Sequence, residues 1–226
     1  MNAPAVCGPL CRNIIIEEGG TLKVDRWDNG TATGGRLVLF AADLILIQGC
    51  IDVSGAGYRG GVGITNSVDL DVDLDAETAA AQGESVRGEG ELSSDASNGG
   101  GGGGGKGCEA YGTTGGSGGG YGLAGEDAPS NRRHGVHLAG QGGVTYGSAN
   151  LSSLHLGSGG GAGHAYVLKQ SRGGHGGRGG GCIHLSGKQV WITPGGMVLA
   201  DGKPGEESWP KRICDRHLTY VSLFRR

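Results

Sequence analysis

The sequence has few of the side chains that fill an ordinary globular core. Only 5% of its residues are aromatic, and it holds two Phe and two Met. No run of about 18 apolar residues occurs, so the sequence predicts no membrane span. Lys and Arg number 19 against 22 Asp and Glu, and the net charge of −3 argues against a polyanion-binding protein as the default class.

The start of the chain and its cysteines also lack familiar patterns. Met1 to Cys11 has neither a basic start nor an apolar core, so it is not a secretory signal, and the chain is either cytosolic or a piece of a larger secreted protein. The six cysteines do not have the spacing of a small disulfide scaffold, which leaves their pairing open. Two glycosylation sequons, at Asn29 and Asn150, would matter only outside the cell.

What the chain has in excess is glycine, with 53 of 226 residues. Two blocks that enclose the glycine-rich region repeat one another: without a gap, Gly34–Ser54 aligns with Gly180–Ala200. In each block apolar pairs recur every seven residues, and the spacing of two within a pair puts both side chains on one face of a strand. The aligned pairs are Leu37 and Leu39 with Ile183 and Leu185, Leu44 and Leu46 with Val190 and Ile192, and Ile51 and Val53 with Met197 and Leu199.

A third, partial copy over Ile14–Val24 precedes the other two. Gly20, Gly49 and Gly195 lie just ahead of the last strand of each copy, where glycine supplies the positive φ of a tight turn. Three strands linked by short corners give a coil of roughly 20 residues, the size of one turn of a three-sided parallel β-helix. The sequence therefore predicts an all-β fold with a short parallel β-helix, or solenoid, as its core. A β-sandwich of hairpins is the competing geometry, because seven-residue periods also suit antiparallel strands.

The composition divides the chain further. We expect the solenoid core at 14–61 and 180–206, an acidic low-complexity linker at 62–98, a glycine-rich insertion at 99–179, and a C-terminal tail or cap at 207–226. In the linker, aspartates alternate with Val and Leu over residues 68–75, which indicates one half-buried strand followed by a flexible segment.

Two physical interpretations of the glycine-rich insertion compete. The glycines form either a flexible spacer or an ordered set of polyproline-II-like segments, packed so closely that only glycine fits between their backbones. The ordered interpretation is favoured because a spacer gains nothing from the apolar and aromatic residues between the glycine runs. Four tyrosines among them are our candidate interaction surface: Tyr111, Tyr121, Tyr146 and Tyr166.

Most of residues 14–205 resembles the glycine-rich β-solenoid repeats of large, uncharacterised surface proteins, through GGTLKVDRWDNGTATGGRLVLFAADLILIQGCIDVSGAGYRGG and GGRGGGCIHLSGKQVWITPGGMVLADG. That resemblance implies structural motifs and no established catalytic residues. More weakly, GGGGGGGKGCEAYGTTGGSGGGYGLAG is similar to the glycine-rich extracellular domain of the anaplastic lymphoma kinase receptors, in which packed glycine helices bind protein ligands. The flanks differ from those receptors, so receptor function is not implied.

Patterns that carry chemistry are weak. Gly105-Lys106 lacks the hydroxyl residue that a phosphate-binding loop needs, and neither Cys7 with Cys11 nor His134 with His137 has a second pair at zinc spacing. A β-helix enzyme acting on carbohydrates needs paired carboxylates, and the only candidate in the repeated strands, Asp52, has no acidic counterpart. Three Arg-Gly-Gly tracts, at Arg59, Arg172 and Arg178, resemble RNA-binding segments but are few and scattered in an acidic chain.

We therefore predict a non-catalytic structural or adhesive module, extracellular or on the cell surface, without cofactor, metal or catalytic residue. Its expected partners are a protein, a glycan or further copies of itself, as a homo-oligomer or filament, rather than nucleic acid. Open solenoid ends expose unpaired strand edges, which favours end-to-end association. The alternatives from other classes are a β-helix carbohydrate-active enzyme and an RNA-binding protein of the Arg-Gly-Gly type.

Overall fold

The computed structural model describes residues 11–63, 78–108, 112–129, 140–148, 150–151, 153–164 and 173–205. Within these ranges there is no helix, and all regular structure is β, as the sequence predicted. The strands are β1 (Cys11–Ile16), β2 (Thr21–Leu22), β3 (Arg36–Ile47), β4 (Cys50–Asp52), β5 (Thr78–Ala79), β6 (Lys106–Cys108), β7 (Gly112–Thr113), β8 (Cys182–Ser186), β9 (Gln189–Ile192) and β10 (Met197–Leu199).

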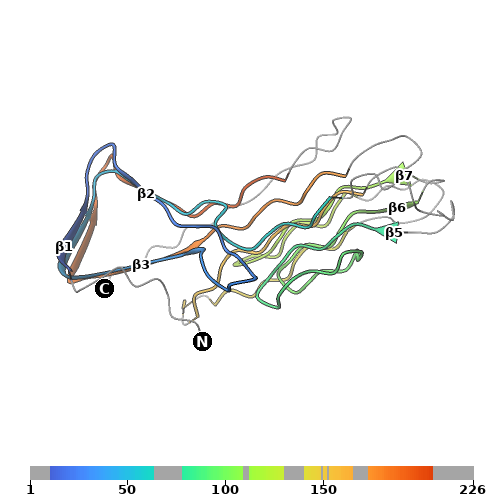
Figure 1. Ribbon diagram of the computed structural model, residues 1–226, viewed down its shortest axis with the longest axis horizontal. Helices are drawn as coiled ribbons and strands as arrows, with labels where there is room; N and C mark the ends of the chain where they lie inside the picture. The colour runs from blue at the N-terminus through green and yellow to red at the C-terminus, as the bar shows by residue number, and fades with distance from the viewer. Residues whose placement is uncertain are drawn as a thin grey trace.

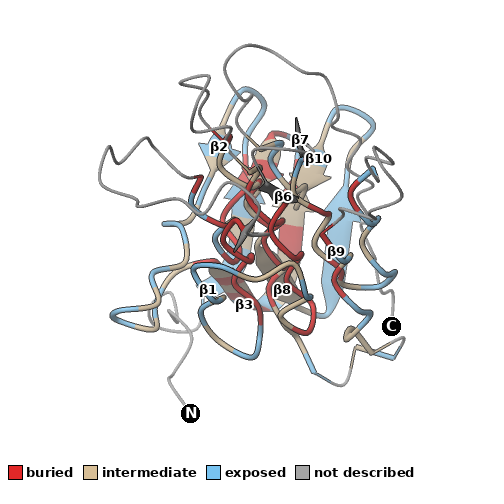
Figure 2. Ribbon diagram, turned by 90° about the vertical axis from the view of Figure 1, so that its right-hand side faces the viewer, coloured by how far each residue is buried: buried red, intermediate tan, exposed pale blue. Residues whose placement is uncertain are grey.

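The molecule is elongated, with parallel sheets at one end and glycine-rich segments extending side by side from them (Figure 1). We call this second part the glycine bundle; it comprises the described residues of 55–63, 78–129, 140–164 and 173–181. Viewed from the bundle end, buried segments lie in the middle and exposed segments at the periphery (Figure 2). The bundle and the sheets share one continuous chain path, which crosses between them several times.

Two parallel sheets connect the three repeated copies. In one sheet β3 lies between β1 on one side and β8 and β9 on the other, and in the second sheet β4 lies between β2 and β10. Every one of these pairs is parallel, which excludes the sandwich of hairpins for this part of the chain. The small antiparallel sheet of β5, β6 and β7 lies at the far end of the glycine bundle (Figure 1).

The register of the second and third copies follows the ungapped alignment only in the first strand pair. Leu37 lies beside Ile183 as predicted, but Val190 lies beside Ile45 and not beside Leu44. Ile51 lies beside Val198 and not beside Met197. The reason is that the corners differ in length between the copies, so the pairing is one residue off the ungapped alignment in the second strand pair and one residue off in the opposite direction in the third. A slip of one residue moves the neighbouring side chains to the other face, and Ile45 rather than Leu44 is the fully buried residue.

The corner glycines stack, with one correction. Cys50 N donates to Gly20 O at 2.9 Å and Met197 N donates to Gly49 O at 2.9 Å, so the third member of the stack is Gly196 and not Gly195. Gly20 and Gly49 do not have the positive φ that the sequence analysis expected. A Cβ on Gly49 would instead come within 3.0 Å of the backbone of neighbouring turns. Close approach between stacked backbones, rather than a left-handed corner, is what requires glycine at this position.

The apolar core is small and centres on the second copy, which is covered on both sides by the other two. Its most deeply buried side chains, Ile45, Ile47 and Ile51, are 0% exposed. Residues of the first and third copies, such as Ile14 and Ile183, pack against this core but stay partly exposed. The full buried cluster is Ile16, Leu37, Leu39, Ala41, Ile45, Ile47, Ile51, Val53 and Ala56.

The glycine bundle is held by backbone hydrogen bonds between segments that are distant in the sequence. Gly61 N donates to Gly160 O at 2.9 Å, Gly176 N donates to Gly61 O at 2.8 Å, and Gly161 N donates to Ser117 O at 2.9 Å. These residues belong to no assigned strand, yet their donors and acceptors are paired across segments. In the described residues, the glycine-rich insertion is therefore ordered and not a loose spacer.

Part of the predicted acidic linker belongs to this bundle. Ala80 and Ser85 are 0% and 1% exposed, and Ala80 N donates to Gly105 O at 2.8 Å. Residues 80–85 thus depart from the flexible linker expected over 62–98, because they are buried among the glycines, Gln82 and Glu84 included. The half-buried strand expected over 68–75 lies outside the described residues.

Candidate functional site

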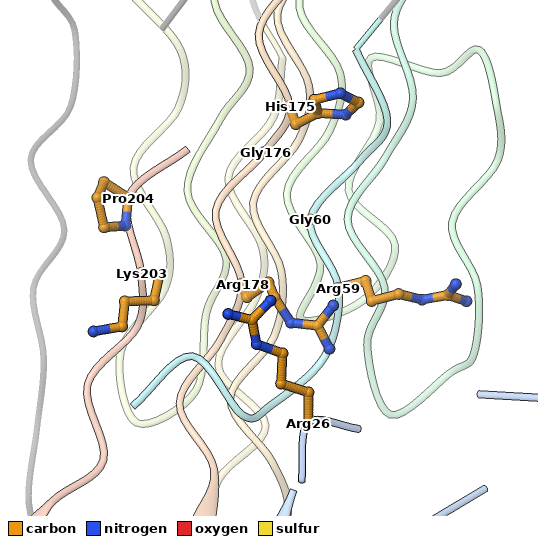
Figure 3. Close-up of a pocket in the computed structure, with 8 residues that line it drawn as sticks. All are labelled: Arg26, Arg59, Gly60, His175, Gly176, Arg178, Lys203 and Pro204. Carbon is orange, nitrogen blue, oxygen red and sulfur yellow. The ribbon is translucent and has the colours of Figure 1, made fainter. Parts of the chain in front are cut away.

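Basic side chains gather where the chain leaves the third strand of each copy. Because β2, β4 and β10 are neighbours in one parallel sheet, the segments that follow them begin at the same edge. Arg26 follows β2, Arg59 follows β4 and Lys203 follows β10. With Arg178, which precedes β8, they line a pocket of about 370 Å³ (Figure 3). The remaining lining residues are Gly60, His175, Gly176 and Pro204.

Arg178 anchors the pocket to the segments around it. Its Nη2 donates to Trp27 O at 2.9 Å and to Gly57 O at 3.2 Å, and its Nε donates to Gly55 O at 3.2 Å. Burial lowers the pKa of the Arg178 guanidinium, and the positive charge of nearby Arg26 lowers that pKa further. Figure 3 shows the Arg26 and Arg178 side chains reaching toward the same place, with Arg59 and Lys203 extending to either side.

Arg59 differs from the other cations because it has carboxylate partners. Its Nε lies 3.3 Å from Glu84 Oε2, and its Nη2 lies 2.6 Å from Glu89 Oε1. Burial by itself lowers the pKa of Arg59, but the hydrogen bonds to these two carboxylates outweigh it and the pKa is raised. Glu84 is 4% exposed and also accepts hydrogen bonds from Trp27 Nε1 at 2.8 Å and from Arg59 N at 2.9 Å. Glu84 is therefore a buried junction, a single carboxylate that links Trp27 to the pocket residue Arg59.

The pocket carries excess positive charge. Among the described residues, no carboxylate oxygen lies within 4.0 Å of a side-chain nitrogen of Arg26, Arg178 or Lys203. The chain as a whole has a net charge of −3, so the local charge of the pocket is opposite in sign to that of the whole chain. An arrangement of this kind is suited to holding an anionic group.

None of the described residues that line this pocket is acidic. Asp52, the one carboxylate that the sequence analysis singled out, accepts a hydrogen bond from Ser54 N at 2.9 Å, and the hydrogen bonds with Ser54 lower its pKa. His175 Nδ1 accepts a hydrogen bond from Gly63 N at 3.0 Å. Asp52 thus closes a local turn, and His175 holds backbone in the bundle.

A second hollow, of about 250 Å³, lies on the outer face of β3 and β8. It is largely apolar, with Val38, Phe40 and Leu154 in its lining, and it contains the free thiol of Cys182. Burial raises the pKa of Cys182, although the charge of Arg36 opposes this. A thiol with a raised pKa is a poor nucleophile at neutral pH, so this hollow shows no activated cysteine.

Two of the three Arg-Gly-Gly arginines meet at the basic pocket. Arg59 and Arg178 both line it, and Arg172 lies outside the described residues. Sequence reasoning missed Arg26 and Lys203, which belong to no motif. The signal that points to them is positional, since each follows the third strand of its copy within a few residues.

The candidate tyrosines serve packing where the structure describes them. The Tyr121 and Tyr146 rings meet edge to face with centroids 5.3 Å apart, and the Tyr146 hydroxyl bonds to Leu156 O and accepts a hydrogen bond from Ser158 Oγ at 2.9 Å. Burial raises the pKa of Tyr146 and, to a smaller extent, that of Tyr121. Tyr111 and Tyr166 lie outside the described residues.

Replacing Tyr146 with phenylalanine should lower the free energy of unfolding by about 1–2 kcal/mol, because the Leu156 carbonyl and the Ser158 hydroxyl lose a buried partner. Chemical denaturation followed by circular dichroism measures the change. Tyr121→Phe is the matched control, since Tyr121 is the other member of the ring pair. An equal loss in both variants would contradict the assignment of the effect to the Tyr146 hydroxyl.

The remaining sequence candidates are dispersed. Asn29 is half-buried in the turn closed by Asp28 N donating to Thr33 O at 2.9 Å, and Asn150 is exposed. Across the described ranges no three His, Cys, Asp or Glu side chains come together as a metal site. None of the described segments is a helix with the length and hydropathy needed to cross a membrane.

The parallel sheets end on exposed apolar strands. β9 pairs with β3 along one edge, and no strand of the described part of the chain pairs with its other edge. Trp191 is 61% exposed, and Val190 and Ile192 are each 37% exposed. At the opposite end β1 likewise pairs only with β3 among the described strands, and its Ile15 is 53% exposed.

Comparison of the chain with models of protein families, with curated proteins and with solved structures gives no match. The two features described above, the basic pocket and the open sheet ends, are therefore interpreted on their own geometry.

Proposed function

We propose that this protein is a non-catalytic structural or adhesive module, extracellular or on a cell surface, whose copies associate end to end. In this proposal the three repeated copies are successive turns of a short parallel solenoid, and the glycine bundle is a rigid body of polyproline-II-like segments attached to it. The observation that carries the proposal is that β1 and β9, at the two ends of the sheets, each have an apolar edge with which no described strand pairs. The resemblance to glycine-rich repeats of surface proteins agrees with it.

The side chains at the two ends would continue each other's rows. Val190 and Ile192 extend the rows of Ile45 and Ile47, which are fully buried because strands cover them on both sides. Ile14 and Ile16 occupy the same rows at the other end. A second copy that placed its β1 beside β9 would bury Val190 and Ile192 in the way that Ile45 and Ile47 are buried within one chain.

The backbone is also oriented for this contact. Thr193 N donates to Ile47 O at 3.0 Å, and alternate residues of a strand bond to opposite sides, so the N–H groups of Val190 and Ile192 face the free edge. The two ends carry different strands, so each contact leaves an open end on both copies. Association of this head-to-tail kind forms open chains rather than closed dimers.

Ile192→Lys should weaken this association at least tenfold, because a charged side chain would occupy the row that the second copy has to cover. Static light scattering over a concentration series measures the average mass. The unchanged protein should rise in mass with concentration, whereas Ile192→Lys should stay monomeric over the same range.

Leu92→Lys is the matched control, since Leu92 is 82% exposed and lies in the glycine bundle away from the strand edges. Its mass should follow that of the unchanged protein. A monomeric unchanged protein throughout the series, or an equal drop in mass for Leu92→Lys, would remove the support for end-to-end association.

A further inference from the structure

We propose that the basic pocket binds an oxyanion carried by an acidic saccharide, either a sulfate ester or a uronate carboxylate. The pocket is formed by residues other than the strand edges, so its occupation does not depend on association of copies. The choice of a saccharide as the carrier rests on the proposed extracellular role, and the anion chemistry rests on the pocket itself.

Uncompensated cations gather around the pocket. Arg26, Arg178 and Lys203 arrive from three parts of the sequence, and in the described residues none of the three has an ion-pair partner. Holding like charges together costs free energy that an anion would relieve. The arginine guanidinium offers several N–H donors in a plane, which matches the oxygens of a sulfate or a carboxylate.

One of these cations is fixed in place before any ligand arrives. Arg178 donates to three backbone carbonyls, so its guanidinium is positioned by the fold. Arg26 has no side-chain partner in the described part of the chain and remains available beside it (Figure 3). Because the Arg178 guanidinium is already held in place beside that of Arg26, less side-chain freedom is lost when a ligand binds.

The rest of the pocket lining favours a saccharide as the carrier of the anion. Gly60 and Gly176 line the pocket without side chains, and Pro204 is its one apolar lining residue. The volume of about 370 Å³ is at the lower end of the range for small-molecule sites, about 300–1,000 Å³. A hydroxylated sugar ring suits a lining of backbone and basic groups, whereas a peptide would need apolar pockets for its side chains.

Nucleic acid fits this place less well. Single-stranded nucleic acid is bound along a track of cations interleaved with exposed aromatic faces. Here the cations surround one hollow, and the aromatic rings next to Arg26 and Arg59 in the sequence, Trp27 and Tyr58, are packed edge to face with centroids 5.6 Å apart. The Trp27 indole N–H is already donated to Glu84.

Isothermal titration calorimetry on the full chain tests the proposal with four probes: a heparin-type sulfated hexasaccharide, a hexamer of galacturonate, inorganic sulfate and poly(U) RNA. At least one of the two saccharides should bind, with an affinity that falls as salt rises. Arg26→Gln should weaken that binding about tenfold, and Arg26→Gln with Lys203→Gln should weaken it further. Binding of the sulfated probe only, or of the galacturonate only, identifies which oxyanion the pocket takes.

Arg12→Gln is the matched control, because it removes the same charge from β1, where Arg12 pairs with Asp43. Its affinity for the saccharide should equal that of the unchanged protein. The proposal is overturned if neither saccharide binds, if inorganic sulfate binds as tightly as the saccharides, if poly(U) binds more tightly than they do, or if Arg12→Gln weakens binding as much as Arg26→Gln. Circular dichroism confirms that each variant is folded.

The two proposals fail separately. A protein that binds the saccharide but stays monomeric in light scattering retains the pocket and loses the end-to-end association. A protein that associates but binds neither saccharide retains the end-to-end association and loses the proposed anion site.

Discussion

Gly161→Ala should lower the free energy of unfolding by about 3 kcal/mol or more, a large effect for a substitution that adds one methyl group. A Cβ on Gly161 would come far closer than 3.0 Å to the carbonyl oxygen of Gly103. Real Cβ atoms essentially never come within 3.0 Å of such an atom. The atom it would meet is backbone, which cannot rotate away as a flexible side chain does. The segments would have to separate, and the hydrogen bonds that Gly161 and its neighbours make across the bundle would be lost with them.

Two adjacent glycines provide a matched test of this reasoning. A Cβ on Gly116 would collide with the backbone of Gly161 and Ala162, whereas a Cβ on Gly115 has nothing within 4 Å. Gly116→Ala should therefore destabilise the protein by an amount similar to Gly161→Ala. Gly115→Ala should be neutral or slightly stabilising, because alanine reduces the conformational freedom of the unfolded chain.

Chemical denaturation measures all three variants, and hydrogen exchange of the backbone amides locates the effect. The amides of the glycine bundle should lose protection in Gly161→Ala and Gly116→Ala and keep it in Gly115→Ala. If both adjacent substitutions were equally tolerated, the bundle would not be packed backbone against backbone, and the rigid body in the proposed function would be lost.

Glu84→Gln should lower the free energy of unfolding by about 3 kcal/mol. The two carboxylate oxygens of Glu84 accept from Trp27 Nε1 on one side and from Arg59 N and Nε on the other. An amide has one oxygen and one NH2 group, so one of these sets of donors would face another donor. Since Glu84 is 4% exposed, water has little access to repair the mismatch.

Glu89→Gln is the control for charge, because Glu89 also pairs with Arg59 but its side chain is 63% exposed. Loss of the Glu89–Arg59 ion pair should lower the free energy of unfolding by no more than about 1 kcal/mol, as for other solvent-exposed ion pairs. Thermal and chemical denaturation compare the two variants. Equal effects would show that the net charge around Arg59, and not the buried junction at Glu84, stabilises this part of the protein.

Several features of the fold were predictable from the sequence. The repeated apolar pairs and the corner glycines indicated parallel strands in stacked copies, and the parallel pairing of β3 with β8 and β9 has that arrangement. The aromatic and apolar residues between the glycine runs indicated an ordered insertion. Both predictions used local patterns with a direct physical meaning: the two-residue period of a strand and the need of a packed segment for anchoring side chains.

The register was less predictable. Residues 44–47 read Leu-Ile-Leu-Ile, so both faces of that strand are apolar and the period of two cannot choose between them. The choice depends on the lengths of the corners, and those differ between the copies. Only pairing against neighbouring strands places Ile45 and Ile47 inside and Leu44 and Leu46 on the other face.

The sequence by itself determined the β class and the presence of three related copies, and it favoured an ordered glycine-rich part, because each of these depends on patterns of residues close together in the chain. Only the tertiary structure decided that residues 80–85 join the glycine bundle, that Glu84 is a buried junction, and that Arg26, Arg178 and Lys203 surround one pocket. These residues are far apart in the sequence, and no local pattern links them to one another. Parallel strands bring the ends of three copies to a single edge of a sheet, and that convergence arises only when the copies are stacked.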